Sequence, residues 1–399
     1  MSKKLFLKYT SSMKVKKIEV VGLNNSENLI HLIFNDDINI ITGRNGSGKT
    51  TILKLLWYCI SANIERAIQE ITFVKVVITT SEYTLVVEKS ESKNRESVYL
   101  LLTRNSGEVL IDRKEPIHKG NAVEEANEIT VNLFDTSIFF PTFRRIEGGF
   151  SLLSETNYIS RRIVKGHEEF FVNERHRSGA RVQEALESHA DNLSVSEHKF
   201  VSSISTVDIQ QLVARKHNDA TTKVNDFSKS LSEKIFSEIR SYRTTYSPEK
   251  DALKNAISTL DKINQDVTEL EKVREDAFKS LTVLSDIIVA IFKHKGIKLN
   301  QRITLGDIDQ SINSDSLSAG EKQMLSFLCY NALYSDCPFF IDEPELSLHV
   351  DWQRILIDVM IEQKTNNQFF ISTHSPFIYT QYTDKEIILD SDRGDNFER

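Results

Sequence analysis

The chain has 399 residues, of which 40% are hydrophobic and 27% charged, ordinary values for a soluble globular protein of two or three domains. Its net charge of −7 argues against a surface that coats nucleic acid, although it allows a local basic patch. No segment is long enough to span a bilayer, and the apolar run Leu5-Phe6-Leu7 is too short for a signal peptide. We therefore expect a cytoplasmic protein without membrane contact.

Cysteines are sparse and lie in apolar surroundings. Cys59 and Cys329 fall in apolar helical patterns, and Cys337 leads into an apolar strand. Their spacing matches no set of metal ligands, and a small odd number fits a reducing compartment. The sequence therefore predicts that these thiols pack in the core.

The N-terminal part predicts strands that lead to a glycine-rich turn. Residues 16–21 and 29–34 have strand character and flank the polar turn Asn24-Asn25-Ser26. Residues 38–42 form a continuous apolar run, typical of a strand buried on both faces. After the turn, an apolar helix is expected to continue to about Gln69.

The glycine-rich turn fits the P-loop pattern at every fixed position. Glycine allows the tight curl in which backbone N–H groups and the following helix N-terminus point at phosphate. We expect Lys49 to contact the β- and γ-phosphates and Thr50 to offer its hydroxyl to Mg²⁺. The expected nucleotide-binding residues are Gly43, Arg44, Asn45, Gly46, Ser47, Gly48, Lys49, Thr50 and Thr51.

Short alternating strands follow, at 73–78, 83–88, 98–103 and 108–111. Asn105-Ser106-Gly107 is a good hairpin turn between the last two. Such an antiparallel patch is unusual for a plain doubly wound domain. Residues 131–140 then predict a long apolar strand that Pro141 stops.

From about residue 146 the sequence becomes polar and helical in character, and one stretch is locally basic. Two interpretations stay open for it: a contact with nucleic acid or a partner, or a solvated face on which glutamates dilute the charge. The basic residues are Arg161, Arg162, Lys165, Arg175, Arg177 and Arg181. The aromatic residues Phe170 and Phe171 lie between them, and the glutamates are Glu168, Glu169 and Glu174.

Two long helices are expected next. Apolar residues recur at alternating spacings of three and four from Leu212 to Tyr242 and from Leu253 to Ile291, interrupted by Arg274. Ser247-Pro248-Glu249 is typical of a helix start, and the helix from there to about Lys295 would be roughly 70 Å long. The pair predicts an antiparallel coiled-coil hairpin, and the alternative is a helical lobe without a protruding arm.

The last 85 residues hold further motifs that could carry chemistry. Leu317-Ser318-Ala319-Gly320-Glu321 opens an apolar helix to about Tyr334, a phosphate-binding arrangement. The apolar run 338–341 ends in Asp342, which can hold Mg²⁺ through water, and Glu343, which can polarise an attacking water.

Residues 344–349 lead into a helix around 352–362. A second apolar strand, 368–371, then ends in Ser372-Thr373-His374. A histidine at a strand end can contact a γ-phosphate, although a lone histidine is more often structural.

The order of these motifs resembles an ABC-type ATPase head over residues 14–145 and 297–390. The Asp-Glu-Pro-Glu-Leu-Ser-Leu-His and Ser-Thr-His-Ser-Pro runs resemble the branch of overcoming-lysogenization-defect (OLD) proteins and RecF- and SMC-like ATPases. Residues 140–145 also resemble stand-alone ATPase subunits of anti-phage systems such as PARIS and Septu. The implied α/β fold is a P-loop head with a parallel core sheet and an antiparallel patch, at 1–145 and 297–399, and a helical coiled-coil insertion at 146–296.

The resemblance also implies how the motifs cooperate. Two heads would sandwich two ATP molecules, so the chain would form a head-to-head dimer or a higher homo-oligomer. Ser318 and Gly320 would act on the partner's ATP, whereas the residues acting in their own chain would be Lys49, Thr50, Asp342, Glu343 and His374. Residues 345–348 would form a loop across the dimer interface.

Two departures from the family pattern stand out. The junction between head and insertion has no glutamine to help bind Mg²⁺ and water, and no aromatic residue near Leu23 offers a surface for adenine. Asp390, Asp392 and Asp395 suggest a metal site, but no glutamate motif accompanies them, so we expect no nuclease in this chain.

The expected function is an Mg²⁺-dependent ATPase that senses a trigger in anti-phage defence and controls a separate effector, such as a Toprim or HNH nuclease. One alternative is a RecF- or SMC-like DNA-repair ATPase that DNA stimulates through residues 161–181. Another is a scaffold that binds ATP with negligible turnover, which the presence of Glu343 disfavours.

Overall fold

The computed structural model describes residues 13–25, 29–92, 95–142, 160–164, 167–171, 188, 190–201, 206–244, 252–292 and 317–389. The chain divides into two compact units. The first consists of Met1–Ile204, Ser318–Met324 and Tyr334–Arg399, and the second of Ser205–Leu317 and Leu325–Leu333. No helix in the described part of the chain combines the length and the apolar character needed to cross a membrane.

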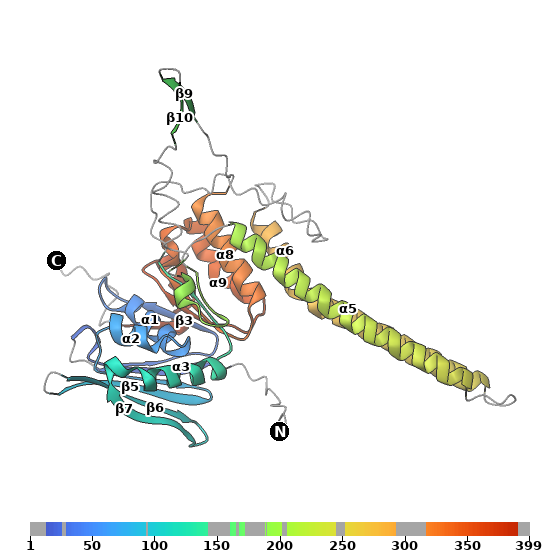
Figure 1. The fold of residues 1–399 in the computed structure, drawn as a ribbon, viewed down its shortest axis with the longest axis horizontal. Coiled ribbons are helices and arrows are strands. Elements are labelled where there is room, and N and C mark those ends of the chain that lie inside the picture. Colours follow the sequence, from blue (N-terminus) through green and yellow to red (C-terminus); the bar gives the residue numbers. More distant parts are fainter. Residues whose placement is uncertain are drawn as a thin grey trace. The chain divides into compact units, whose positions relative to one another are not determined.

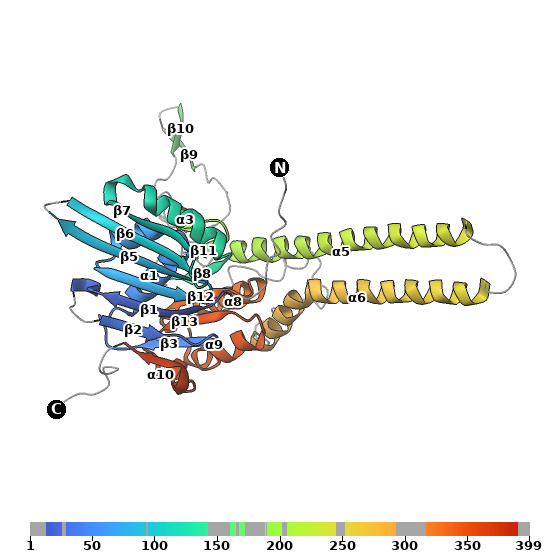
Figure 2. The same ribbon diagram turned by 90° about the horizontal axis from the view of Figure 1, so that it is seen from below.

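Among the described residues, the first unit is built on two six-stranded sheets, one antiparallel and one parallel (Figures 1 and 2). The antiparallel sheet of the described residues has the order β2 (Leu29–Ile33), β1 (Val15–Val21), β4 (Lys75–Thr80), β5 (Tyr83–Ser92), β6 (Arg95–Arg104) and β7 (Val109–Pro116). The parallel sheet has the order β11 (His198–Phe200), β8 (Ser137–Phe140), β12 (Pro338–Asp342), β13 (Gln368–Ser372), β3 (Ile38–Thr42) and β14 (Glu386–Ile388). The predicted α/β fold with both kinds of sheet is therefore confirmed.

Helix α1 (Lys49–Ile60) lies at the centre of the core. Its residues from Leu55 to Ile60 are all buried, as expected for a helix that packs against neighbours in several directions. Its Trp57 ring lies 5.4 Å from Phe139 of the parallel sheet, and the same core cluster contains side chains of β1, β4, β5 and β6. Figure 1 shows α1, α2 and α3 on one side of strands β5–β7. Cys59 is fully buried in this core, and Cys329 and Cys337 are buried too, as the sequence predicted.

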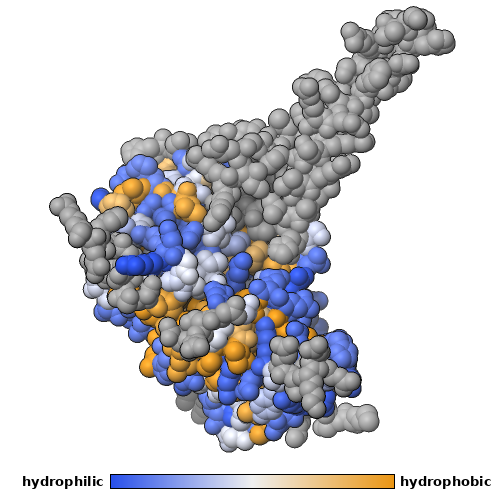
Figure 3. Space-filling view, turned by 90° about the vertical axis from the view of Figure 1, so that its left-hand side faces the viewer, coloured by the Kyte–Doolittle hydropathy of each residue, from blue (hydrophilic) through white to orange (hydrophobic). Residues whose placement is uncertain are grey.

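Hydrophobic residues also reach the surface. Leu29 and Ile33 on the edge strand β2 are 61% and 70% exposed. Figure 3 shows one face of the molecule on which hydrophobic residues gather in the middle and hydrophilic residues border them. Apolar patches on a surface are common on proteins that bind partners.

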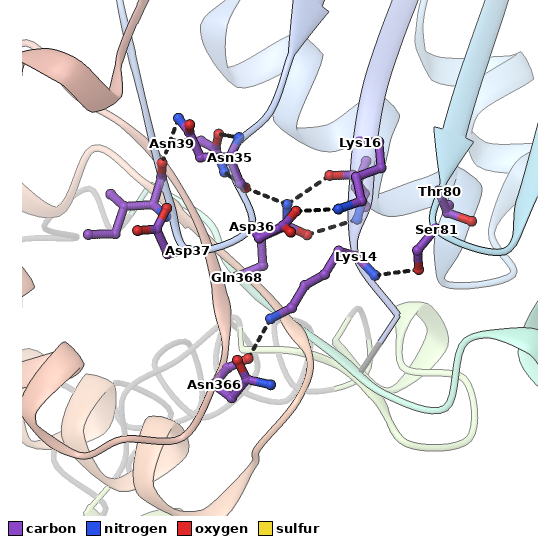
Figure 4. Close-up of polar contacts among 12 residues, drawn as sticks. Lys14, Lys16, Asn35, Asp36, Asp37, Asn39, Thr80, Ser81, Asn366 and Gln368 are labelled. Carbon is purple, nitrogen blue, oxygen red and sulfur yellow. Dashed lines mark hydrogen bonds and ion pairs between the residues drawn. The ribbon is translucent and has the colours of Figure 1, made fainter. Parts of the chain in front are cut away.

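A buried amide links the two sheets. Gln368, at the start of β13, donates from Nε2 to the carbonyl oxygens of Val15 and Asn35, both at 2.7 Å, and accepts from Val15 N–H at 2.8 Å (Figure 4). Lys14 adds a hydrogen bond of 2.6 Å to the carbonyl of Asn366. Gln368 thus joins the start of β13 to the start of β1 and to the turn before β3 through direct hydrogen bonds to backbone groups.

The first helix is shorter than the sequence predicted. Instead of running to about Gln69, it ends at Ile60, and a separate helix α2 spans Ile64–Glu70. Ala62 has a positive φ of 59°, which no helix continues through. The buried Asn63 side chain holds this break by donating to Ser61 Oγ and to the Leu193 carbonyl, both at 2.9 Å.

The predicted strand at 131–140 is wrong over its first part. Helix α3 (Asn121–Leu133) occupies it, and only Ser137–Phe140 forms the strand β8. The buried positions Ala122, Val123, Ala126 and Thr130 follow the helical period, so packing overrides the strand preference of the β-branched residues 130 and 131. The expectation of helix after 146 is also wrong at Ser160–Val164 and His167–Phe171, which pair as the antiparallel strands β9 and β10.

The second unit contains the expected helices, α5 (Thr206–Thr244) and α6 (Ala252–Ile291), which run side by side (Figure 2). Their direction is antiparallel, because Lys234 pairs with Asp266 at 2.6 Å while the His217 ring meets Phe278 at 5.4 Å. Ile239 and Leu260, which belong to the predicted apolar spacing of the two helices, are 44% and 64% exposed. Supercoiling of the pair stays a prediction, and the proposed start at Ser247-Pro248-Glu249 lies outside the described residues.

The buried His198 makes the stability of the fold depend on pH. His198 is fully buried beside Ser137, with 2.7 Å between Nδ1 and Oγ, and burial lowers its pKa to about 4. In the unfolded chain its pKa returns to 6.5, so below pH 6.5 the unfolded state binds the extra proton. This residue's contribution to stability is therefore lost as pH falls from 6.5 to 4.

We predict that this loss amounts to about 3 kcal/mol in the free energy of unfolding. Urea denaturation between pH 7 and 4 should show it as a difference between the wild type and His198→Gln, in which the other titrating groups cancel. Parallel pH curves for the two proteins would contradict the assignment.

Candidate functional site

Three neighbouring parallel strands bring the sequence motifs to one edge of the sheet. Strand β13 lies between β3 and β12, with Ser372 paired to Ile41 on one side and to Asp342 on the other. The glycine-rich loop after β3, the carboxylates after Ile341 and the residues after β13 therefore lie at adjacent strand ends. Ligands of open parallel sheets bind at this carboxyl edge.

The glycine-rich loop has the backbone that only glycine adopts readily. Gly43, Gly46 and Gly48 have φ values of 148°, 84° and 94°, and helix α1 begins directly after Gly48. The free N–H groups of the helix start and the positive end of its dipole favour an anion at this place. Ser47 Oγ is buried and has no partner among the described residues, so a phosphate oxygen would satisfy it.

Lys49 is held over the same loop. Its side chain is buried, and Nζ donates to the carbonyl oxygens of Gly43 and Arg44, each at 3.0 Å. Burial lowers the pKa of Lys49, while the carboxylates of Glu343 and Asp342 act in the opposite direction. A cation in this position can bind a phosphate that enters the loop.

Asp342 is the meeting point of hydroxyl groups from separate segments. The residue is 2% exposed, and Oδ1 accepts hydrogen bonds from Thr50 Oγ1 at 2.9 Å and from Ser372 Oγ. Oδ2 accepts from Thr142 Oγ1. Carboxylate and hydroxyl oxygens are the ligands that Mg²⁺ prefers. The described residues contain no cluster of three His, Cys, Asp or Glu side chains, so such an ion would also need phosphate oxygens or water.

Thr142 is a site residue that the sequence did not predict. The junction after residue 140 has no glutamine, and no other side chain was expected to contribute there. Strand β8 pairs with β12 so that Phe140 lies beside Ile341, which carries Thr142 to Asp342. A polar residue shortly after a fully apolar strand was the available signal, but only the strand order shows which carboxylate it meets.

Glu343 and His374 face each other across the site. Glu343 has a left-handed backbone with φ 50° and ψ 57°, and its N–H donates to the Ser372 carbonyl at 3.0 Å. Its Oε1 lies 4.0 Å from Nε2 of His374. Burial, aided by the neighbouring Asp342 and Glu345 carboxylates, raises the pKa of Glu343, whereas burial and Lys49 lower the pKa of His374. A carboxylate with a raised pKa is a better proton acceptor.

Glu345 fixes the turn that carries His374. Its carboxylate accepts hydrogen bonds from Thr373 Oγ1 at 2.8 Å and from the backbone N–H of His374 at 2.6 Å. Burial raises the pKa of Glu345, while these hydrogen bonds act in the opposite direction. From the sequence, Glu345 was expected only in a loop at a dimer interface.

Ser318 and Gly320 begin helix α8 (Ala319–Leu333). Ser318 N–H donates to Glu321 Oε2 at 2.6 Å, and Glu321 N–H donates to Ser318 Oγ at 3.3 Å, which together form a capping box. Gly320 lies so close to the loop after β12 that a Cβ atom would be 2.4 Å from the Ser347 carbonyl oxygen. The helix start therefore packs directly on this loop.

A cleft of about 880 Å³ opens beside the glycine-rich loop, a size suited to a small molecule such as a nucleotide. Ser318 and Gly320 are not among its described lining residues, whereas Lys49, Glu343 and His374 are. The lining residues are Asn24, Asn45, Gly46, Gly48, Lys49, Thr50, Thr51, Glu343, Glu345, Leu346 and His374.

The sequence is similar to that of known proteins. Residues 38–379 match the family model described as "AAA domain, putative AbiEii toxin, Type IV TA system". A 75-residue stretch is 39% identical to Endonuclease GajA of Bacillus cereus (strain VD045). The match covers 17% of this chain and 13% of that protein.

Solved structures of Smc head domains are also similar. One is bound to the C-terminal winged-helix domain of ScpA, with 13% identity and a TM-score of 0.36. The other has an extended coiled coil and is bound to the C-terminal domain of ScpA from Pyrococcus furiosus, with 14% identity and a TM-score of 0.34. Each comparison covers 92% of this chain and 91% of the other.

We predict that Gly320→Ala lowers the free energy of unfolding by roughly 1–3 kcal/mol, because the new methyl group would overlap the Ser347 carbonyl. The sign is diagnostic, since the same change inside an ordinary helix raises stability by up to about 1 kcal/mol. Thermal or urea unfolding measures it, and a stabilised variant would show that the close approach does not exist.

Proposed function

Because the chain belongs to the family described as "AAA domain, putative AbiEii toxin, Type IV TA system", and is an ABC-type ATPase of the OLD, RecF and SMC branch, we propose that it hydrolyses ATP in a head-to-head dimer. One observation carries the proposal: Lys49, Thr50, Asp342, Glu343 and His374 gather around one cleft. Each has a side chain suited to one step of phosphoryl transfer to water.

The chain's own residues would divide the work as follows. Backbone N–H groups of residues 43–51 and the Lys49 amine hold the phosphates. Thr50 and Asp342, with Thr142, would hold Mg²⁺, which when bound neutralises charge on the phosphates.

Glu343 accepts a proton from the attacking water, whose oxygen bonds to the γ-phosphorus as the bond to the bridging oxygen breaks, giving ADP and phosphate. His374, whose lowered pKa keeps it neutral near pH 7, donates an N–H to the γ-phosphate.

Ser318 and Gly320 would complete the site from a second chain. Their absence from the described lining of the cleft supports this arrangement. Ser318 Oγ accepts one hydrogen bond from Glu321 N–H and can still donate its own hydrogen to a phosphate oxygen. In this proposal, residues 1–145 and 297–399 form the ATPase head, and residues 146–296 form a helical insertion in it.

We further propose that the ATPase acts in the cytoplasm as a sensor that controls a separate effector, such as a Toprim or HNH nuclease, in anti-phage defence. The support is the resemblance of its motifs to defence ATPases and the short match to an endonuclease. This chain itself would not be the nuclease, and Asp390, Asp392 and Asp395 lie outside the described residues. The DNA-repair alternative depends on residues 161–181, for which the structure describes no side-chain contact.

Glu343→Gln tests the hydrolytic role. The amide cannot accept the proton, so we expect phosphate release to fall at least about a hundredfold while ATP still binds and the dimer accumulates. Phosphate-release assays and light scattering with ATP measure the two effects. Lys49→Ala serves as the control that should bind no nucleotide, and an unchanged turnover in Glu343→Gln would remove this residue from catalysis.

Thr142→Ala tests the hydroxyl beside Asp342. Because the variant removes a donor to a buried carboxylate at the metal site, we expect the Mg²⁺ concentration for half-maximal binding of fluorescent ATP to rise about tenfold. Binding without Mg²⁺ should not change, and Thr142→Ser should restore the wild-type value. An identical Mg²⁺ dependence in Thr142→Ala would contradict the assignment.

A further inference from the structure

We infer that the buried side chain of Gln353 couples the two ATP sites of a dimer, by joining the surface that meets a second chain to the turn that carries His374. The inference rests on the proposed head-to-head dimer. It concerns residues 344–349, which we call the interface loop. The helix start that carries Ser318 lies on one side of this loop, and the chain's own catalytic histidine lies on the other.

The first link is steric. Gly320, two residues after Ser318, approaches the interface loop so closely that an added Cβ would lie 2.4 Å from Ser347 O and 3.8 Å from Leu348 Cα. Packed backbone at this distance has no free space to absorb a shift. A movement of the helix start towards the loop must therefore move Ser347 and Leu348.

The second link is the amide of Gln353. This residue of helix α9 (Val350–Glu362) is 8% exposed. Its Nε2 donates to the Leu348 carbonyl at 2.8 Å and to the Glu345 carbonyl at 3.3 Å, so it holds both ends of the interface loop. Its Oε1 accepts a hydrogen bond of 2.6 Å from Oγ of Ser375, a residue in the turn after β13. One side chain thus joins two segments that are far apart in the sequence.

The third link leads from this turn into the ATP site. Ser375 N–H donates to Thr373 Oγ1 at 3.0 Å, and Thr373 Oγ1 donates to Glu345 at 2.8 Å. Glu345 also accepts the backbone N–H of His374 at 2.6 Å. His374 in turn lies 4.0 Å from Glu343, the proposed base. The contacts are continuous from Gly320 to the base.

This chain of contacts has a consequence for regulation. When a partner's ATP draws Ser318 and Gly320 into place, the interface loop has to move with them. It then either carries the His374 turn along or breaks hydrogen bonds of this network, of which those from Gln353 to Leu348 and from Ser375 to Gln353 are buried. Occupation of one ATP site therefore sets the geometry of the other, and the coupling is reciprocal. Hydrolysis in the dimer should respond cooperatively to ATP.

The test uses the 399-residue chain and measures the rate of ATP hydrolysis against ATP concentration. We expect a Hill coefficient clearly above 1 and at most about 2 for the wild type, since two sites are coupled. Gln353→Met keeps the volume but makes none of these hydrogen bonds, and its Hill coefficient should fall to 1. Binding of fluorescent ATP should stay within about twofold, because Gln353 does not line the cleft. The matched control is Glu362→Gln, an exposed position at the end of the same helix.

A second variant keeps the test decisive if Gln353→Met lowers thermal stability. Gln353→Glu can still accept from Ser375 but cannot donate to the loop carbonyls, so it should also lose cooperativity. Wild-type Hill coefficients in both variants would overturn the inference. So would a wild-type dimer that hydrolyses ATP with a Hill coefficient of 1. A different result would overturn the proposed function and the coupling with it: no ATP hydrolysis by the wild type, and no ATP-dependent dimer of either the wild type or Glu343→Gln.

Discussion

The site depends on one buried carboxylate, that of Asp342. A charge that is 2% exposed is costly unless hydrogen bonds or a cation compensate it. Among the described residues, Thr50, Thr142 and Ser372 supply hydroxyl hydrogen bonds, each from a different segment. The carboxylate therefore fixes the P-loop helix, the end of β8 and the end of β13 against one another. The same oxygens are suited to share a cation with the phosphates of a bound nucleotide.

The interface loop places a second constraint on the same strand end. Glu343 leaves β12 in a left-handed conformation, and a loop follows that touches Gly320 on one side and the His374 turn on the other. A single short segment thus contacts both the residues proposed to act on the chain's own ATP and those proposed to act on a partner's. Rigid contacts of this kind make the two roles hard to separate.

Much of this site was predictable because its motifs are local. The P-loop, the pair Asp342 and Glu343, and His374 each follow an apolar strand, and parallel strands place such ends at one edge. Thr142 and Gln353 were not predictable, since Thr142 meets Asp342 200 residues away, Gln353 meets Ser375 22 residues away, and no local pattern marks these pairs. The break in the first helix at Ala62 was missed for a similar reason, because the buried Asn63 is held by the carbonyl of Leu193.

The sequence by itself determined that this chain has a glycine-rich loop of the P-loop pattern, a parallel core with an antiparallel patch and a pair of long helices. Glycine positions, apolar runs and helical spacing are properties of neighbouring residues, and they are legible without a structure. Only the tertiary structure decided that Thr142 faces Asp342, that Gly320 has no room for a side chain and that Gln353 joins two loops. Strand order and the packing of distant segments set those contacts, and neither is written in any one stretch of the chain.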